Sequence, residues 1–111
     1  MDEAGNIYIS GFTDGGFPLT QNALLKTQQA ARQGFVTKIS QAGSVVYSTY
    51  VNGGGCLTLD LLGNPIIAGH TAIKDLFTSP NAYQRNFKGG LVDLYVQSLN
   101  AGGSALIYAT Y

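Results

Sequence analysis

Few residues of this chain carry side chains that could do acid–base or nucleophilic chemistry. His70 is the only histidine and Cys56 the only cysteine, beside six acidic and six basic residues. A base for acid–base catalysis needs a partner carboxylate, and the sequence places none at a recognisable spacing from His70. We expect His70 to be partly buried against neighbouring structure and Cys56 to pack as a small apolar side chain. The sequence predicts a non-enzymatic protein, and a single cysteine excludes an internal disulfide and a cysteine metal cluster.

Two Asp-x-x-Gly-Asn segments, Asp2 to Asn6 and Asp60 to Asn64, are the remaining candidates for cation ligation. Calcium loops carry several oxygen ligands at alternate positions, whereas each segment here offers one Asp before its Gly-Asn pair. An Asp at the start of a turn commonly accepts hydrogen bonds from backbone N–H groups two or three residues on. We therefore expect turn capping at both places, with no metal and no cofactor.

Composition and charge exclude several classes of partner. The 111 residues are 45% hydrophobic and 11% charged, with a formal net charge of zero. The six basic residues are scattered, whereas nucleic acids and anionic membranes need clustered Lys and Arg. No apolar run is long enough for a membrane-spanning helix, and the first three residues lack the pattern of a signal peptide. We expect no nucleic-acid partner and no membrane insertion.

The elements that position these residues occur twice. Residues 2–11 return as 60–69, and residues 43–50 return as 103–111 with one inserted residue. The offset stays close to 60 residues. Repeated units of this kind bury their apolar faces by stacking on neighbours, and about three units are normally needed for stability. With two units present, the chain is expected to be part of a larger assembly.

Short strand patterns dominate the chain. They are rich in Val, Ile, Tyr and Thr, and several are apolar on both faces, which is typical of sheets covered on both sides. The predicted strands are 7–12, 35–40, 45–51, 56–60, 65–70, 94–99 and 105–111. Gly53-Gly54-Gly55 is not followed by the Lys-Ser/Thr of a phosphate-binding loop, so it is interpreted as the connection between the two units. Residues 22–33 favour a short helix with Asn22 as its cap.

Each complete unit has four strands, which is the layout of a β-propeller blade. The pattern Asp-x-x-Gly-Asn-x-Tyr-x-x-Gly-x-Thr, followed by an aromatic-Val strand and Gly-Ser-x-x-x-Tyr-Ser-Thr-Tyr, resembles the bacterial SBBP-type β-propeller repeat family. The resemblance covers the chain twice, as repeat 1 (1–52) and repeat 2 (53–111). Copy two departs from it at Pro65-Ile66-Ile67, His70 and Ala109. The resemblance implies an extracellular or cell-surface bacterial scaffold of repeats.

Repeat 1 lacks the inner strand that residues 57–60 supply to repeat 2. Either the chain is cut from a longer propeller or a neighbouring molecule completes the blade. The expected function is a scaffold or interaction module, whose partners are further blades of the same parent chain or of other copies. Tyr47, Tyr50, Tyr108 and Tyr111 recur at equivalent places and are expected to pack between blades.

The alternative is a glycan-binding, lectin-like propeller. It requires exposed aromatic and amide side chains in the long excursions at 14–34 and 72–93. Residues compatible with it are Asn81, Tyr83, Gln84 and Asn86.

Overall fold

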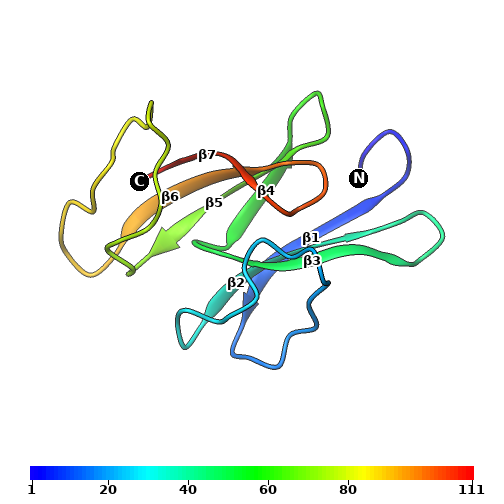
Figure 1. Cartoon of the computed structure of the whole chain (residues 1–111), viewed down its shortest axis with the longest axis horizontal. Helices are drawn as coiled ribbons and strands as arrows, with labels where there is room; N and C mark the ends of the chain where they lie inside the picture. Colours follow the sequence, from blue (N-terminus) through cyan, green and yellow to red (C-terminus); the bar gives the residue numbers. More distant parts are fainter.

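The computed structural model describes all 111 residues, and the chain is all-β. Each strand lies within two residues of its prediction: β1 (Ile7–Thr13), β2 (Gln33–Ile39), β3 (Val45–Val51), β4 (Gly55–Leu59), β5 (Pro65–Thr71), β6 (Asp93–Leu99) and β7 (Leu106–Thr110). They form two antiparallel meanders (Figure 1), which we call sheet A (β1-β2-β3) and sheet B (β4-β5-β6-β7). No helix of a kind that could cross a membrane is present.

The two sheets repeat one another in register. Val36 lies opposite Thr49 in sheet A, and Val96 lies opposite Thr110 in sheet B. The strand pairing is interrupted at the same place in each sheet, after Lys38 and after Ser98. The inserted residue of the second copy is taken up by the last hairpin turn, where the Asn100 N–H donates to the Ala105 carbonyl. Side chains at equivalent positions therefore face equivalent sides.

The predicted helix at 22–33 is wrong, because this segment runs beside β3 instead. The Tyr50 N–H donates to the Leu25 carbonyl at 3.2 Å, and the Leu25 N–H donates to Thr49 Oγ1 at 3.0 Å. Asn22 lies in a turn closed by the Ala23 N–H and the Thr20 carbonyl, so it caps no helix. An isolated helix of about 12 residues is marginal in water, whereas the free edge of β3 offers unpaired backbone groups.

The main core lies between the two sheets. Five side chains are fully buried there: Val36, Tyr47 and Val51 from sheet A, and Ile67 and Leu99 from sheet B. Packing face to face is how two such sheets remove their apolar sides from water. A second cluster forms where the 72–92 excursion covers one end of sheet B, and it contains Tyr95, Ala109 and Tyr111 with Leu76 and Phe87.

The glycine connection between the units is confirmed. The chain leaves β3 at Val51 and enters β4 at Gly55. A β-carbon on Gly54 would lie 2.6 Å from the Gly11 carbonyl oxygen and 2.7 Å from the Gly34 α-carbon. Only glycine allows backbones to approach so closely. The crossing brings β4 beside β1, where Ser10 Oγ donates to the Gly55 carbonyl at 2.9 Å.

Candidate functional site

The carboxylate of Asp2 is bound by its own turn and by the two strands beside it. Its Oδ1 accepts hydrogen bonds from the N–H groups of Ala4 at 3.1 Å and Asn6 at 2.9 Å. Its Oδ2 accepts from Asn6 Nδ2 at 2.8 Å and from the Tyr8 hydroxyl at 3.2 Å, and Lys38 Nζ lies 3.7 Å away. The predicted turn capping is confirmed, with N–H donors two and four residues on.

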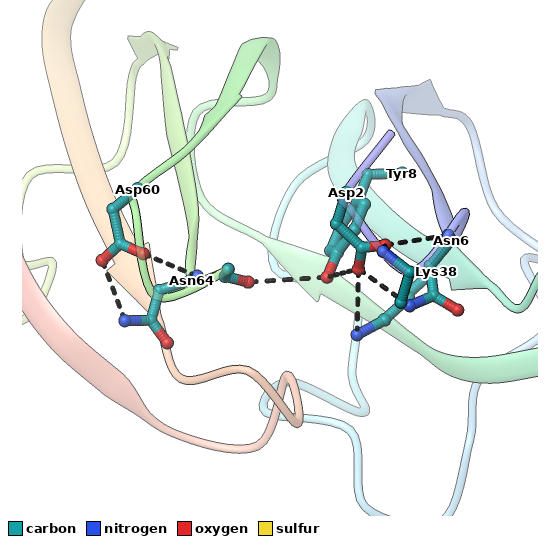
Figure 2. A network of polar contacts seen from close by, with 8 residues as sticks. Asp2, Asn6, Tyr8, Lys38, Asp60 and Asn64 are labelled. Atoms are coloured by element: carbon teal, nitrogen blue, oxygen red, sulfur yellow. Dashed lines mark hydrogen bonds and ion pairs between the residues drawn. The ribbon is translucent and has the colours of Figure 1, made fainter.

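Asp60 repeats this arrangement without the cation. Its Oδ1 accepts from the N–H groups of Leu62 and Asn64, both at 2.8 Å, and its Oδ2 from Asn64 Nδ2 at 2.8 Å. The Tyr8 hydroxyl also lies 3.4 Å from the carbonyl oxygen of Gly63. Figure 2 shows this link between the two turns, which come from different sheets. The twin turns are thus part of the contact between the sheets.

These hydrogen bonds stabilise the ionised carboxylates of Asp2 and Asp60. Donation from Asn6, supported by Tyr8 and Lys38, lowers the pKa of Asp2 to about 2. The backbone and side chain of Asn64 lower the pKa of Asp60. A shallow pocket of about 380 Å³ lies between the turns, lined by residues 1–4 and 59–63. Both carboxylates accept hydrogen bonds from backbone N–H groups of their own turns, so they act as turn caps. No group of three His, Cys, Asp or Glu side chains that could hold a metal ion is present.

His70 is exposed, so its predicted partial burial is wrong. Its ring lies against Phe12, with centroids 5.9 Å apart, and the Arg32 guanidinium lies 5.0 Å above the same Phe12 ring. Through Phe12, His70 contacts sheet A, whereas Leu94, its cross-strand neighbour on β6, is exposed. It therefore lies at the rim of the contact between the sheets rather than inside it.

Cys56 is also exposed, which corrects the prediction that it packs as a small apolar side chain. It lies on β4 opposite Ala68, in the same cross-strand row as Val96. This row faces away from sheet A. The strand was located correctly, but its apolar neighbours are uncovered in the monomer.

The contact between the sheets joins two different faces. Sheet A contributes the face that carries Tyr8, Val36 and Tyr47, and sheet B contributes the face that carries Ile67 and Leu99. We call these the tyrosine face and the isoleucine face. Since the units are repeats, sheet B also has a tyrosine face and sheet A also has an isoleucine face. The tyrosine face of sheet B has no second sheet over it. On the isoleucine face of sheet A, the excursion at 14–34 covers Ser48 and Tyr50, whereas Ile7 and Ile9 stay exposed.

Burial at equivalent positions shows the asymmetry directly. Val36 and Tyr47 are fully buried, whereas their counterparts Val96 and Tyr108 on sheet B are half-buried. Ile67 is fully buried, whereas its counterpart Ile9 on sheet A is 44% exposed. The open isoleucine face of sheet A also carries a mainly apolar groove of about 490 Å³, whose lining includes Ile9, Phe35, Val45, Phe17 and Leu19.

Of the four tyrosines expected to pack between blades, Tyr47 lies between the two sheets. Its ring lies over Gly103 in the last turn of sheet B. Tyr50 and Tyr111 instead pack against aromatic residues of their own excursions, Phe17 and Phe87. Tyr108 is half-buried, and its hydroxyl accepts a hydrogen bond from the Tyr83 N–H at 3.3 Å.

The excursions contain a matched element that the sequence reasoning missed. The N–H of Thr20 donates to the Ser48 carbonyl at 3.0 Å, and the N–H of Ser79 donates to the Ala109 carbonyl at 2.9 Å. Their hydroxyls accept in return from the N–H groups of Ser48 and Ala109. The signal was present as Thr-x-Asn-Ala (20–23) and Ser-x-Asn-Ala (79–82). Both anchor the excursion to the last strand of its sheet.

The residues proposed for glycan contact are partly brought together. Tyr83, Gln84 and Asn86 line a shallow polar pocket of about 420 Å³ with Arg85 and Lys88, whereas Asn81 does not line it. Tyr83 is 94% exposed, as predicted for a loop aromatic. The Gln84 amide is engaged within the loop, since Nε2 donates to Asp93 Oδ2 at 2.7 Å.

No protein-family model matches the chain, and comparisons with curated proteins and with solved structures give no match. Function must therefore be inferred from the chain's own faces and loops. The tyrosine face of sheet B and the part of the isoleucine face of sheet A around Ile7 and Ile9 have no partner within the chain.

Proposed function

We propose that the chain is a non-enzymatic scaffold, formed by two units of a β-propeller of the SBBP repeat type, which binds further blades through its two open faces. The observation that carries the proposal is the heterologous contact between sheets A and B. A contact between unlike faces leaves one face of each kind unpaired. Such contacts continue from subunit to subunit and form closed rings when the rotation permits.

The residues of the open faces are of the kinds that a partner would bury. No Asp, Glu, Lys or Arg lies on either of them. The tyrosine face of sheet B carries Cys56, Thr58, Ile66, Ala68, His70, Leu94, Val96, Ser98, Tyr108 and Thr110. The isoleucine face of sheet A carries Ile7, Ile9, Gly11, Phe35, Thr37, Ile39, Ser48 and Tyr50. Of these, Thr37, Ser48 and Tyr50 are already buried within the chain, so Ile7 and Ile9 are the exposed apolar residues of this face. Depletion of charge is the compositional mark of an interface core.

The free edge of β1 supports the same function. Sheet B begins with β4, which pairs along β5 from Leu59↔Pro65 to Gly55↔Gly69. Sheet A has no strand at the equivalent edge of β1. Exposed sheet edges are natural sites for strand addition. A blade-like partner would cover an open face and could supply this strand, from the same parent chain or another copy.

The solution mass tests the proposal. The chain has a mass of 11.7 kDa, and light scattering on a sizing column should detect association into a discrete species, such as a trimer or tetramer, as concentration rises. A monodisperse monomer that unfolds cooperatively at all concentrations would contradict the proposal, because its open faces would then need no partner.

A glycan-binding, lectin-like propeller is the second candidate, favoured by the exposed Tyr83 ring beside the polar pocket of Gln84, Asn86 and Lys88. Exposed aromatic side chains provide stacking surfaces for the apolar faces of sugars. The measurement is binding of the assembled protein to immobilised glycans, with Tyr83→Ser as the matched variant. Binding that is absent, or that is unchanged in Tyr83→Ser, would count against this function.

A further inference from the structure

The contact between sheets A and B contains a specific set of contacts around Gly103, made by Tyr47 and Leu24, which we call the lock. The ring of Tyr47 lies so close over Gly103 that a β-carbon at position 103 would overlap it. The N–H of Leu24 donates to the Gly103 carbonyl at 3.2 Å, and Asn22 Nδ2 donates to the Gly102 carbonyl at 3.4 Å. Leu24 also packs against the main core. One turn of sheet B is thus held by β3 and by the excursion of the first unit.

The chain carries a second copy of every part of this lock. Tyr108 corresponds to Tyr47, because each lies next to the irregularity in its strand pairing, opposite Ser98 and Lys38 respectively. Tyr83 corresponds to Leu24, because each follows the Asn-Ala pair of its excursion. Gly43 corresponds to Gly103, because each donates its N–H to the first residue of its turn, Ser40 or Asn100.

In the second copy of the lock, the turn at Gly43 has no tyrosine over it. Gly43 is exposed, and nothing lies within 4 Å of the position where its β-carbon would be. Tyr108 is half-buried and Tyr83 is 94% exposed. Val45 and Val46 beside Gly43 are 55% and 46% exposed, which gives the empty turn an apolar border. The exposed Tyr83, the half-buried Tyr108 and the bare glycine turn are therefore complementary surfaces of one chain.

We infer that a second copy of this chain docks by placing its Tyr108 ring over Gly43 and the backbone N–H of its Tyr83 against that turn, as Tyr47 and the Leu24 N–H do at Gly103. The inference rests on the proposed function and names its partner and anchor residues. In the free chain the Tyr83 N–H donates to the Tyr108 hydroxyl, which holds the two anchors together. On docking, this N–H exchanges the hydroxyl for the Gly43 carbonyl, as Leu24 does with Gly103. Rigid aromatic side chains that are placed in advance lose little entropy on binding.

The first experiment compares association constants by sedimentation equilibrium. Tyr108→Ser should weaken association by about tenfold or more, as truncation of an aromatic anchor does. Leu91→Ser removes a similarly apolar side chain that is 91% exposed and lies outside the lock, so its association constant should equal that of the wild type. Gly43→Ala should weaken association as well. Its control is Gly90→Ala, because Gly90 has a similar φ of +81° against +87° and equally open surroundings.

Mixing the variants gives a test that does not depend on any loss of stability. The Tyr108→Ser chain keeps an intact Gly43 turn, and the Gly43→Ala chain keeps intact tyrosines. At a concentration where the wild type associates and each variant alone is mainly monomeric, an equimolar mixture should form a one-to-one dimer. If the wild type associates and both variants associate as strongly as it does, the Tyr108–Gly43 contact is wrong, and the proposed scaffold function is unaffected. A wild type that never associates would overturn both.

Discussion

The backbone of Gly69 in β5 lies directly against the backbone of Gly54 in the connection between the sheets. A β-carbon on Gly69 would overlap the Gly54 carbonyl oxygen and lie 2.6 Å from the Gly53 carbonyl oxygen. No flexible side-chain atom is available to move away, because both obstacles are backbone. Any larger residue at position 69 therefore forces the backbones of the crossing apart.

Gly69→Ala should lower the free energy of unfolding by about 2–3 kcal/mol, since an inserted methyl group forces the backbone apart. The matched control is Gly102→Ala, where the added β-carbon would lie 3.9 Å from its nearest neighbour, Ser104 Oγ. That change should alter stability by less than about 0.5 kcal/mol. Urea denaturation followed by circular dichroism measures both. Equal midpoints for the two variants would show that the crossing relaxes without cost.

Tyr47→Phe should leave stability unchanged or raise it by up to about 1 kcal/mol. The Tyr47 hydroxyl is buried without a hydrogen-bond partner, and this burial raises the pKa of Tyr47 above its ordinary value. An unsatisfied buried hydroxyl costs about 1–3 kcal/mol, and Phe removes it while keeping the ring over Gly103.

Tyr95→Phe is the contrasting change in an equally buried tyrosine. The Tyr95 hydroxyl donates to the Phe77 carbonyl at 2.6 Å, so its loss should destabilise the fold by about 1 kcal/mol. Thermal unfolding of the two variants beside the wild type measures the difference. If Tyr47→Phe were the more destabilising of the two, the Tyr47 hydroxyl would have to have a partner.

Stability should fall as the pH is lowered from about 4 toward 2. The folded-state pKa of Asp2 is about 2, against an ordinary 3.8, and hydrogen bonds also lower the pKa of Asp60 and Asp93. A lowered folded-state pKa stabilises the fold above the ordinary pKa and loses that effect as the pH falls through the folded value. Urea midpoints at pH 7, 4 and 3 should show the decline.

Asp60→Asn tests which groups cause this acid sensitivity. Because the variant has one fewer carboxylate to protonate, its stability should depend less steeply on pH between 4 and 2 than that of the wild type. Asp75→Asn is the control, since Asp75 is an exposed loop carboxylate that makes no hydrogen bond. An identical pH dependence in wild type and Asp60→Asn would contradict a role for the turn carboxylate.

The thiol of Cys56 should report on the open tyrosine face of sheet B. It is exposed in the single chain and shares a cross-strand row with Ala68 and Val96. A thiol-reactive chromophore should label it rapidly at low protein concentration and more slowly once association covers this face. The Tyr108→Ser variant should label rapidly at every concentration. A labelling rate that stays constant while the mass of the wild type grows would place the interface elsewhere.

The sequence by itself determined the strands, the repeat and the turns, because these depend on neighbouring residues. The apolar runs predicted all seven strands, and Asp2 and Asp60 cap their turns as their spacing indicates. The helix expected at 22–33 failed because hydrogen bonds to Tyr50 and Thr49, far along the chain, outweigh a marginal local preference.

Only the tertiary structure decided which apolar faces are covered. Cys56 and His70 stand on strands with the same composition as the buried ones, so sequence alone could not tell that their side of sheet B stays open. The equivalence of Tyr108 with Tyr47, and of Gly43 with Gly103, was visible in the repeat. Tyr47 and Gly103 contact each other, whereas Tyr108 and Gly43 are free. This difference follows from how the two sheets stack, because a contact between a tyrosine face and an isoleucine face leaves one face of each kind unpaired.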